Sequence, residues 1–210
     1  MRSLYNNWPM PSLAWIIAGL ILGSLPFPYW IGKIFLHTDI RSFGDHAPGA
    51  TNVARAGNKA LYVVAVLLDA FKGTVPVWLA QQISGITGWE LAAVAIAPVL
   101  GHAFSPFLKF KGGMGVATTF GVWLGLLGWL GPLVIAVCIG IMFAIQKNWV
   151  WASVGGATGL LIFLLILQYP LYLITVCIAH TAILAVRRYS YFRSWPELQP
   201  WISRQGKGTL

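Results

Sequence analysis

Long apolar runs alternate with short polar segments along almost the whole chain. A helix that crosses the hydrocarbon core of a bilayer needs about 20 mostly apolar residues. The run from Val116 to Ile145 is too long for one helix, and Gly128 and the pair Gly131-Pro132 divide it into two. The pattern therefore predicts an all-α integral membrane protein of about seven transmembrane helices, at residues 12–36, 60–82, 90–107, 115–130, 132–146, 150–168 and 169–187.

The composition is typical of a chain that lies in lipid. Of the 210 residues, 58% are hydrophobic and only 9% are charged, whereas soluble domains carry about 25% charged residues. The first apolar run is longer than a signal-peptide core and has no small-residue cleavage site, so we interpret it as a retained helix. We expect residues 1–210 to form a single polytopic membrane domain, with a short cytoplasmic C-terminal tail from about residue 188.

The distribution of charge predicts an orientation. The chain carries 14 Lys and Arg residues against 5 Asp and Glu residues, and most of these cations follow the ends of apolar runs. With the N-terminus outside, eleven cations fall on the inner side, as the positive-inside rule requires. The C-terminus is then cytoplasmic, and we expect a plasma (inner) membrane protein with its functional loops on the cytoplasmic side. We interpret the cations as topology determinants and not as a nucleic-acid site.

The sequence does not support a metal or cofactor site. Cys138 and Cys177 lie inside apolar runs and lack metal-ligand spacing, and buried cysteines usually behave as small hydrophobic residues. The patterns H-E-x-x-H, G-x-S-x-G and G-x-x-x-x-G-K-[ST] are absent from the sequence. We therefore expect no metal, no cofactor and no serine-triad chemistry.

Two inner-side loops carry the candidate chemistry. Residues 39–55 form a long connector rich in glycine and hydrogen-bonding side chains, which is either functional or simply solvated. In the second loop, Lys109 and Lys111 precede the turn Gly112-Gly113-Met114-Gly115, which leads directly into an apolar helix. Successive N–H groups in such a turn, with the helix N-terminus behind them, can hold a phosphate group. The alternative is a flexible helix start without a ligand.

Asp69 and Lys72 are charged residues inside a predicted span. Charges in a membrane span are usually paired or functional, and the i, i+3 spacing places these two on one helical face. We favour an internal ion pair that fixes the packing around the site over a catalytic role. His102 lies at the inner end of the next span, close to the glycine turn, and is a candidate ligand contact.

These segments together resemble one family. The motifs that carry the resemblance are Gly23-Ser24-Leu25-Pro26, Ile31-Gly32-Lys33, Gly49-Ala50-Thr51-Asn52-Val53, Leu68-Asp69-Ala70-Phe71-Lys72-Gly73, and Gly101-His102 through Thr118. In this order they resemble the bacterial acyl-phosphate-dependent glycerol-3-phosphate acyltransferase family over roughly residues 20–155, with a weaker similarity near residue 187. The resemblance implies the same seven-span fold.

The resemblance also implies an activity. The family transfers an acyl chain from acyl phosphate to the 1-hydroxyl of glycerol 3-phosphate, which gives lysophosphatidic acid for phospholipid biosynthesis without a metal or coenzyme A. The implied partners are membrane lipid, acyl phosphate and glycerol 3-phosphate. Arg55 and the Lys111-Gly112-Gly113 turn match family positions that bind phosphate groups. The full set of expected substrate- or phosphate-binding residues is Thr51, Asn52, Arg55, His102, Lys111, Gly112, Gly113, Gly115, Ser153 and Arg188.

Several positions differ from the family pattern. The first loop of the family normally contains His-Gly-Ser-Gly-Asn, and here Asp45 stands at the serine and Ala47 at the asparagine. Met114 stands at the second lysine of the glycine turn. The Ser-Leu-x-Ser pattern near the sixth span is Val150-Trp151-Ala152-Ser153, and the C-terminal His-Arg-x-Asn pattern aligns with Arg188-Tyr189-Ser190-Tyr191.

These differences leave two functions open. The first is an acyltransferase in which Asp45 or His46 handles protons, with Arg55 as the third catalytic candidate. The second is a catalytically silent relative that serves as a subunit or lipid-binding component of a membrane protein complex. A transporter is disfavoured, because the predicted spans show no repeat symmetry.

Overall fold

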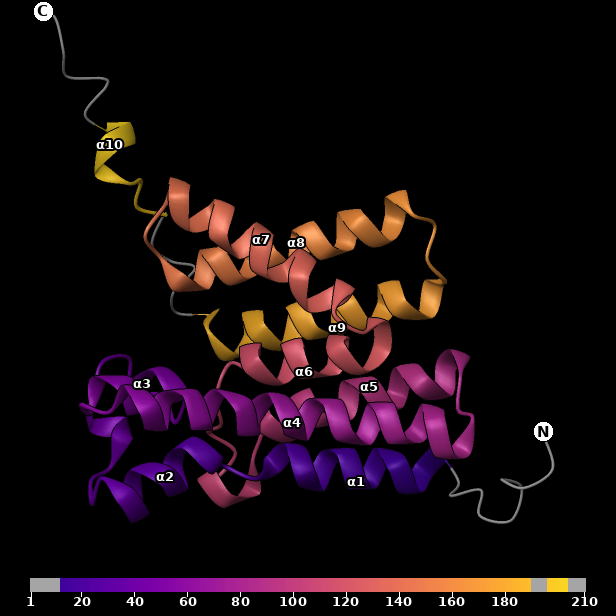
Figure 1. Ribbon diagram of the computed structural model, residues 1–210, viewed down its shortest axis with the longest axis horizontal. Helices are drawn as coiled ribbons and strands as arrows, with labels where there is room; N and C mark the ends of the chain where they lie inside the picture. The colour runs from indigo at the N-terminus through magenta and orange to yellow at the C-terminus, as the bar shows by residue number, and fades with distance from the viewer. Residues whose placement is uncertain (1–11, 190–195, 204–210) are drawn as a thin grey trace, which may run out of the picture.

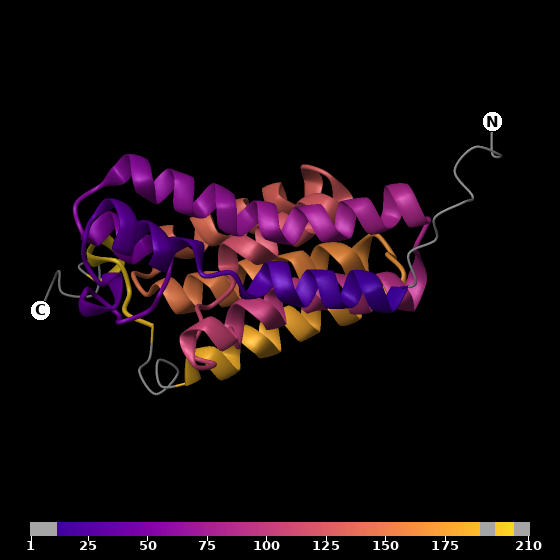
Figure 2. The same cartoon turned by 90° about the horizontal axis from the view of Figure 1, so that it is seen from below.

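The helices run nearly parallel and form an elongated bundle (Figure 1). The computed structural model describes residues 12–189 and 196–203, and every named element in this part of the chain is helical. The start of the first helix, at Ser12, and the end of α9 (Leu171–Arg187) lie at opposite ends of the bundle, as Figures 1 and 2 both show. In chain order the elements are α1 (Ser12–Ser24), α2 (Phe27–Phe35), η1 (Ile40–Ser42), α3 (Ala50–Arg55), α4 (Lys59–Ser84), α5 (Gly88–Ala103), η2 (Pro106–Leu108), α6 (Val116–Leu127), α7 (Leu130–Ile145), α8 (Trp149–Ile166), α9 (Leu171–Arg187) and α10 (Pro200–Ser203).

Each of the seven predicted apolar segments is helical in the structure, so the prediction of an all-α fold is confirmed. Within the described residues, and by length and composition alone, four segments are long and apolar enough to cross a membrane, namely Ser12–Phe35, Lys59–Ser84, Gly88–Leu108 and Trp149–Ile166. The other three are shorter apolar helices, namely Val116–Leu127, Leu130–Ile145 and Leu171–Arg187.

The segment predicted as one helix at residues 12–36 is interrupted, so that prediction was wrong in detail. α1 ends at Ser24, and α2 begins after Leu25 and Pro26. Proline has no N–H group and cannot continue the helical hydrogen-bond ladder. The carbonyl oxygen of Leu25 lies in this break, where it accepts hydrogen bonds from the Phe27 N–H at 3.1 Å and from Lys72 Nζ at 2.8 Å. The break allows α4 to be tied to the junction of α1 and α2.

Glycines allow the central helices to pack backbone against backbone. A Cβ atom on Gly121 of α6 would collide with the carbonyl oxygen of Ala70 on α4. Where α1 meets α5, a Cβ atom on Gly23 would lie 2.6 Å from the Cα of Pro98. Helices in a bilayer associate largely through such close van der Waals packing, because lipid tails are as apolar as the helix surfaces. These glycines therefore determine how closely the helices around the site approach.

The described part of the C-terminal tail, residues 196–203, is docked on the end of α7. The last carbonyl groups of a helix have no partner within the helix. Here the Gln199 N–H donates to the Ile145 oxygen at 2.9 Å, and the Trp201 indole donates to the Ala144 oxygen at 3.1 Å. The tail therefore caps α7 over these residues, where the sequence predicted only a polar extension.

Candidate functional site

A cavity of about 410 Å³ lies between α3, α4 and α6 and reaches the starts of α7 and α8. Six of the ten predicted binding residues line this cavity: Thr51, Asn52, His102, Gly113, Gly115 and Arg188. The predicted catalytic candidate Asp45 lines it as well. The remaining wall is largely apolar and includes Tyr62, Val66, Leu67, Phe120, Leu124, Trp129, Pro132 and Trp149. One cavity thus combines a polar, charged region with a long apolar lining.

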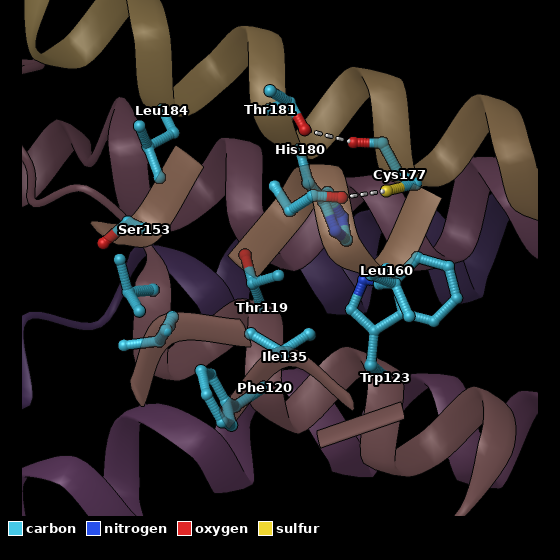
Figure 3. A pocket seen from close by; sticks show the side chains of 13 residues that line it. Thr119, Phe120, Trp123, Ile135, Ser153, Leu160, Cys177, His180, Thr181 and Leu184 are labelled. Atoms are coloured by element: carbon cyan, nitrogen blue, oxygen red, sulfur yellow. Dashed lines mark hydrogen bonds between the residues drawn. The ribbon is translucent and has the colours of Figure 1, made fainter. Parts of the chain in front are cut away.

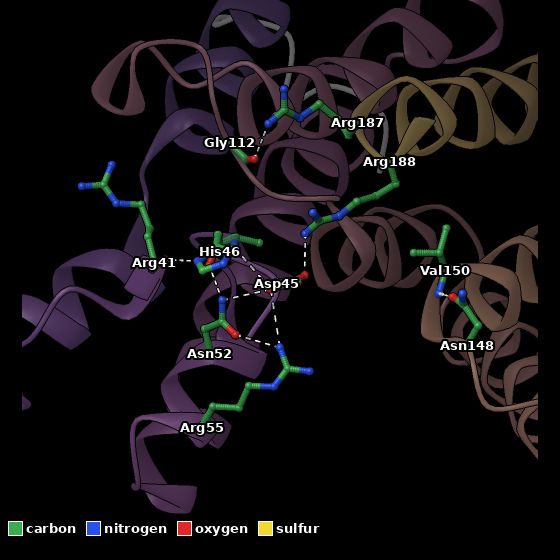
Figure 4. A network of polar contacts seen from close by, with 11 residues as sticks. Arg41, Asp45, His46, Asn52, Arg55, Gly112, Asn148, Val150, Arg187 and Arg188 are labelled. Carbon is green, nitrogen blue, oxygen red and sulfur yellow. Dashed lines mark hydrogen bonds and ion pairs between the residues drawn. The ribbon is translucent and has the colours of Figure 1, made fainter. Parts of the chain in front are cut away.

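Asp45 is the centre of the polar network at this cavity (Figure 4). Its Oδ2 accepts a hydrogen bond from the Arg188 guanidinium at 2.7 Å. Its Oδ1 lies 3.5 Å from the guanidinium of Arg55. The two arginines come from opposite parts of the chain, the end of α3 and the residue after α9, and one carboxylate holds both.

Asn52 organises the loop side of the network. Its side-chain amide donates to Asp45 Oδ1 at 2.9 Å and to the Ala47 oxygen at 2.7 Å. Its side-chain oxygen accepts from Arg55 at 2.9 Å. Gly44 adopts a φ of +52°, and a Cβ atom at this position would collide with the Arg55 guanidinium that packs over it. The backbone conformation favours glycine at this position, and the Arg55 side chain occupies the space that a Cβ atom would take.

His46, the other predicted proton-handling residue, is turned toward a different contact. Its ring Nδ1 lies 2.9 Å from the carbonyl oxygen of Arg41, and the residue is exposed. It is not among the residues that line the cavity. The structure therefore brings Asp45 and Arg55 together with Arg188, and leaves His46 on the outer side of the loop.

The glycine turn forms another part of the wall. A Cβ atom on Gly113 would collide with Nε2 of His102, so the turn can lie against the histidine only with glycine at this position. The carbonyl oxygen of Gly112 accepts a hydrogen bond from the Arg187 guanidinium at 2.6 Å, which ties the turn to the end of α9 (Figure 4). Lys111 is exposed and does not line the cavity.

At the cavity wall, the predicted ion pair between Asp69, which lines the cavity, and Lys72 is confirmed. Lys72 Nζ lies 2.7 Å from Asp69 Oδ1, and the two residues are only 2% and 3% exposed. His102 Nδ1 lies 3.8 Å from the same carboxylate oxygen. Lys72 also donates to the Leu25 oxygen at 2.8 Å. The charge of Asp69 is thus compensated within the protein, and the pair links α4, α5 and the break after α1.

Ser153 lies in a different place from the other predicted binding residues. It lines a second, small cavity of about 30 Å³ between α6, α7, α8 and α9 (Figure 3). Its hydroxyl donates to the carbonyl oxygen of Trp149 one helical turn earlier, at 2.9 Å. In the same cavity, the rings of Trp123 and His180 meet edge to face, with centroids 6.3 Å apart. The structure therefore separates Ser153 from the charged cavity.

Asp39 provides a second acidic residue paired with cations, outside the cavity. Its carboxylate accepts hydrogen bonds from the Arg41 guanidinium at 2.7 and 3.0 Å, and Lys33 Nζ lies 3.8 Å away. The hydrogen bonds from Arg41 hold the pKa of Asp39 at about 2, below its usual 3.8.

Across residues 12–189 and 196–203, no group of three or more His, Cys, Asp or Glu side chains is placed to hold a metal.

Sequence reasoning missed two features of the site. It treated Arg187 only as a topology determinant, whereas its guanidinium anchors the glycine turn through Gly112. It also missed the apolar wall, because Leu67 and Phe120 lie in uniformly apolar helices where the sequence does not distinguish a cavity-facing residue from a lipid-facing one. The predicted position Tyr191 lies outside the described residues.

Comparison with known proteins identifies relatives over most of this chain. The family model described as "Glycerol-3-phosphate acyltransferase" matches residues 13–194. A glycerol-3-phosphate acyltransferase of Bordetella petrii is 41% identical over 144 residues, which cover 68% of this chain and 63% of that protein. A glycerol-3-phosphate acyltransferase of Herminiimonas arsenicoxydans is 38% identical over 145 residues, which cover 68% of this chain and 71% of that protein.

Two crystal structures share the fold of this chain. Both are structures of PlsY (YgiH), described as an integral membrane glycerol 3-phosphate acyltransferase. The glycerol 3-phosphate form has a TM-score of 0.80 at 31% sequence identity, and the lysophosphatidic acid form has a TM-score of 0.76 at 32% identity. Each match covers 87% of this chain and 90% of the other.

Proposed function

This chain belongs to the glycerol-3-phosphate acyltransferase family, and from this membership we propose that it transfers an acyl chain to glycerol 3-phosphate in phospholipid synthesis. The proposed donor is acyl phosphate, and the proposed product is lysophosphatidic acid with release of inorganic phosphate. The aligned segment spans 63% of the length of the Bordetella petrii relative, whereas the likeness to PlsY covers 90% of that chain.

One observation supports this proposal above all: a single cavity joins Arg188, which shares the Asp45 carboxylate with Arg55, to a long apolar wall. The reaction needs a cationic place for a phosphate group and an apolar place for an acyl chain, and the reacting atoms must meet where the two join. The cavity is lined along α6 from Gly115 to Leu124, and Trp149 and Trp129 flank the two ends of α7. At 1.5 Å per residue, the lining of α6 from Val116 to Leu124 extends for about 12 Å, which gives an acyl chain a surface to follow.

The proposed chemistry is positioning together with charge stabilisation. The 1-hydroxyl of glycerol 3-phosphate attacks the acyl carbonyl carbon and a new C–O bond forms. The bond from that carbon to the phosphate oxygen breaks, and the hydroxyl proton leaves with the phosphate. Negative charge develops on the carbonyl oxygen and on the leaving phosphate, where fixed cations and N–H groups are most effective. Arg188 and Arg55 would supply the cations, and the turn at Gly113 and Gly115 would bring backbone close to the substrates.

We further propose that the protein spans the plasma (inner) membrane seven times, with its N-terminus outside and its cavity mouth facing the cytoplasm. The placement of the chain's cations supports this orientation: Arg41, Arg55, Arg187 and Arg188 all come together around the same loops (Figure 4). Reporter fusions at the C-terminus test the topology. A fluorescent protein that matures only in the cytoplasm should fluoresce when it is fused to the C-terminus. A phosphatase that is active only in the periplasm should be inactive in the same fusion, and phosphatase activity would refute the orientation.

The activity is tested with the purified protein in detergent, acyl phosphate and glycerol 3-phosphate, while lysophosphatidate and released phosphate are measured together. We expect the two products in equal amounts. Replacing Arg188 by Gln removes a charged hydrogen-bond donor and should lower kcat/KM by about 10- to 100-fold, since such bonds contribute about 1.5–3 kcal/mol. Arg41→Gln is the matched control, because Arg41 also pairs with an aspartate but lies outside the cavity. A folded protein without turnover would refute the proposal.

A catalytically silent component of a membrane complex is the second candidate. The observation that favours it is the carboxylate of Asp45, which already engages both arginines at the cavity. Isolation of the protein from native membranes in mild detergent distinguishes the two candidates. A silent component should co-purify with defined partner chains and show no acyl transfer, whereas an enzyme should be active on its own.

A further inference from the structure

The Asp45 carboxylate stands where the cavity would have to receive a phosphate group. It lines the cavity together with Arg188, and each of its oxygens faces a guanidinium: Oδ2 at 2.7 Å from Arg188 and Oδ1 at 3.5 Å from Arg55. Carboxylates and phosphates present the same feature to arginine, a pair of anionic oxygens that accept N–H donors in one plane. Asp45 therefore satisfies the arginines in the manner of an anionic ligand.

The surrounding loop holds this carboxylate in place. Asn52, which is only 1% exposed, donates to Asp45 Oδ1 at 2.9 Å, and the Ala47 N–H donates to the same oxygen at 3.3 Å. Asn52 is fixed in turn by its bonds to the Ala47 oxygen and to Arg55. The aspartate is thus oriented by buried partners, and its position does not depend on the exposed side chain of Arg55 alone.

Asp45 is the lining residue whose negative charge weakens the attraction of the cavity for an anion. Asp69 also lines the cavity, but Lys72 compensates its charge at 2.7 Å. Asp45 therefore partly neutralises the positive charge of Arg188, which lines the cavity. It also partly neutralises the charge of Arg55, which does not line the cavity. Arg188 has a side chain only 12% exposed, so it has little room to bind a second anion while Asp45 stays in contact. A phosphate that approaches Arg188 meets a negative charge already in position.

We infer that Asp45 competes with the phosphate group of the substrate for Arg188 and Arg55, and thereby sets the affinity of the cavity for phosphate-bearing ligands. This inference rests on the proposed function only in taking a phosphate as the ligand of the arginines. Binding requires the ligand to displace the carboxylate from Arg188, so a neutral side chain at position 45 strengthens binding. Asp45 is a specificity-determining residue and not a proton carrier.

The test compares binding of glycerol 3-phosphate and of inorganic phosphate to the wild type and to Asp45→Asn, by isothermal titration calorimetry in detergent. The asparagine side chain at position 45 keeps an oxygen that can accept hydrogen bonds from Asn52 and from the Ala47 N–H, but it carries no charge. We expect the Kd for glycerol 3-phosphate to fall about tenfold, as the loss of a screened unit charge close to the ligand predicts. Asp45→Glu keeps the charge and should not show this gain.

Asp39→Asn is the matched control, because Asp39 pairs with Arg41 and Lys33 in the same way outside the cavity. It should leave the Kd unchanged. Unchanged or weaker binding by Asp45→Asn would overturn the inference and would mean that the carboxylate positions the arginines for the ligand. A melting temperature for each variant identifies folded protein, and Asp45→Ser provides a second neutral side chain if the amide does not fold.

Acyl transfer is measured on the same samples, so the two proposals fail separately. Tighter phosphate binding by Asp45→Asn without turnover in any sample supports the inference and refutes the acyltransferase proposal. Turnover by the wild type without tighter binding by Asp45→Asn refutes the inference and leaves the acyltransferase proposal standing.

Discussion

The buried ion pair between Asp69 and Lys72 should be among the most sensitive points of the fold. Lys72→Met keeps most of the aliphatic volume of the side chain and removes the ammonium group. Asp69, 3% exposed, then loses the cation that lies 2.7 Å from its carboxylate, and the Leu25 oxygen loses a donor at 2.8 Å. Removing one partner of a buried pair costs about 3–5 kcal/mol, because the other charge remains buried without compensation.

The free energy of unfolding is measured by titrating the purified protein in mixed micelles with a denaturing detergent and following tryptophan fluorescence. Lys33→Met is the matched control, since the Lys33 side chain is 46% exposed and lies 3.8 Å from Asp39. Exposed ion pairs contribute only about 0.2–1 kcal/mol, so the control should stay close to the wild type.

A double variant completes the test. Asp69→Asn combined with Lys72→Met removes both charges, and it should be more stable than Lys72→Met alone, because no uncompensated charge remains. The reasoning would be wrong if Lys72→Met cost no more than Lys33→Met. It would equally be wrong if the second substitution simply added its own destabilisation to that of the first.

Three further predictions concern helix packing, the tail and the acid-sensitive loop. Gly121→Ala should lower the free energy of unfolding by about 1–3 kcal/mol through overpacking against Ala70, whereas Gly140→Ala, where a Cβ meets nothing within 4 Å, should not destabilise. Trp201→Phe loses the indole hydrogen bond to the end of α7, so limited proteolysis should cut the tail faster; an unchanged rate would contradict the docked tail. The pKa of Asp39 is lowered from 3.8 to about 2, so the stabilisation by ionised Asp39 is complete above pH 3.8 and is lost as the pH falls through about 2. The melting temperature of Asp39→Asn should therefore depend less on pH over this range than that of the wild type. An equal pH dependence of the two melting temperatures would refute the assignment.

The helical segments were predictable because their signal is local. An apolar run of sufficient length predicts a membrane helix whatever its neighbours are, and each of the seven segments is helical in the structure. The pairing of Asp69 with Lys72 was predictable for the same reason, since an i, i+3 spacing on a helix brings two side chains together without help from tertiary contacts. The break at Pro26 could also have been read from the sequence, because proline interrupts the helical hydrogen bonds.

The candidate site was only partly predictable. The sequence placed Thr51, Asn52 and Gly113 near a phosphate, and all three line the cavity. It placed Ser153 there as well, but the rotation of α8 turns this serine toward the small cavity beside His180. A uniformly apolar helix has no polar face to define its rotation, so only its packing against α7 and α9 determines where a single hydroxyl points.

The sequence by itself determined a helical membrane protein, the positions of its helices and the local ion pair within α4. Only the tertiary structure decided that Asp45 and Arg188, 143 residues apart, meet at 2.7 Å, and that Arg187 holds the glycine turn. Local elements follow from neighbouring residues, because hydrogen bonding and periodicity act over a few positions. Contacts between distant residues depend on how whole helices approach, which here is governed by glycines that allow one backbone to touch another.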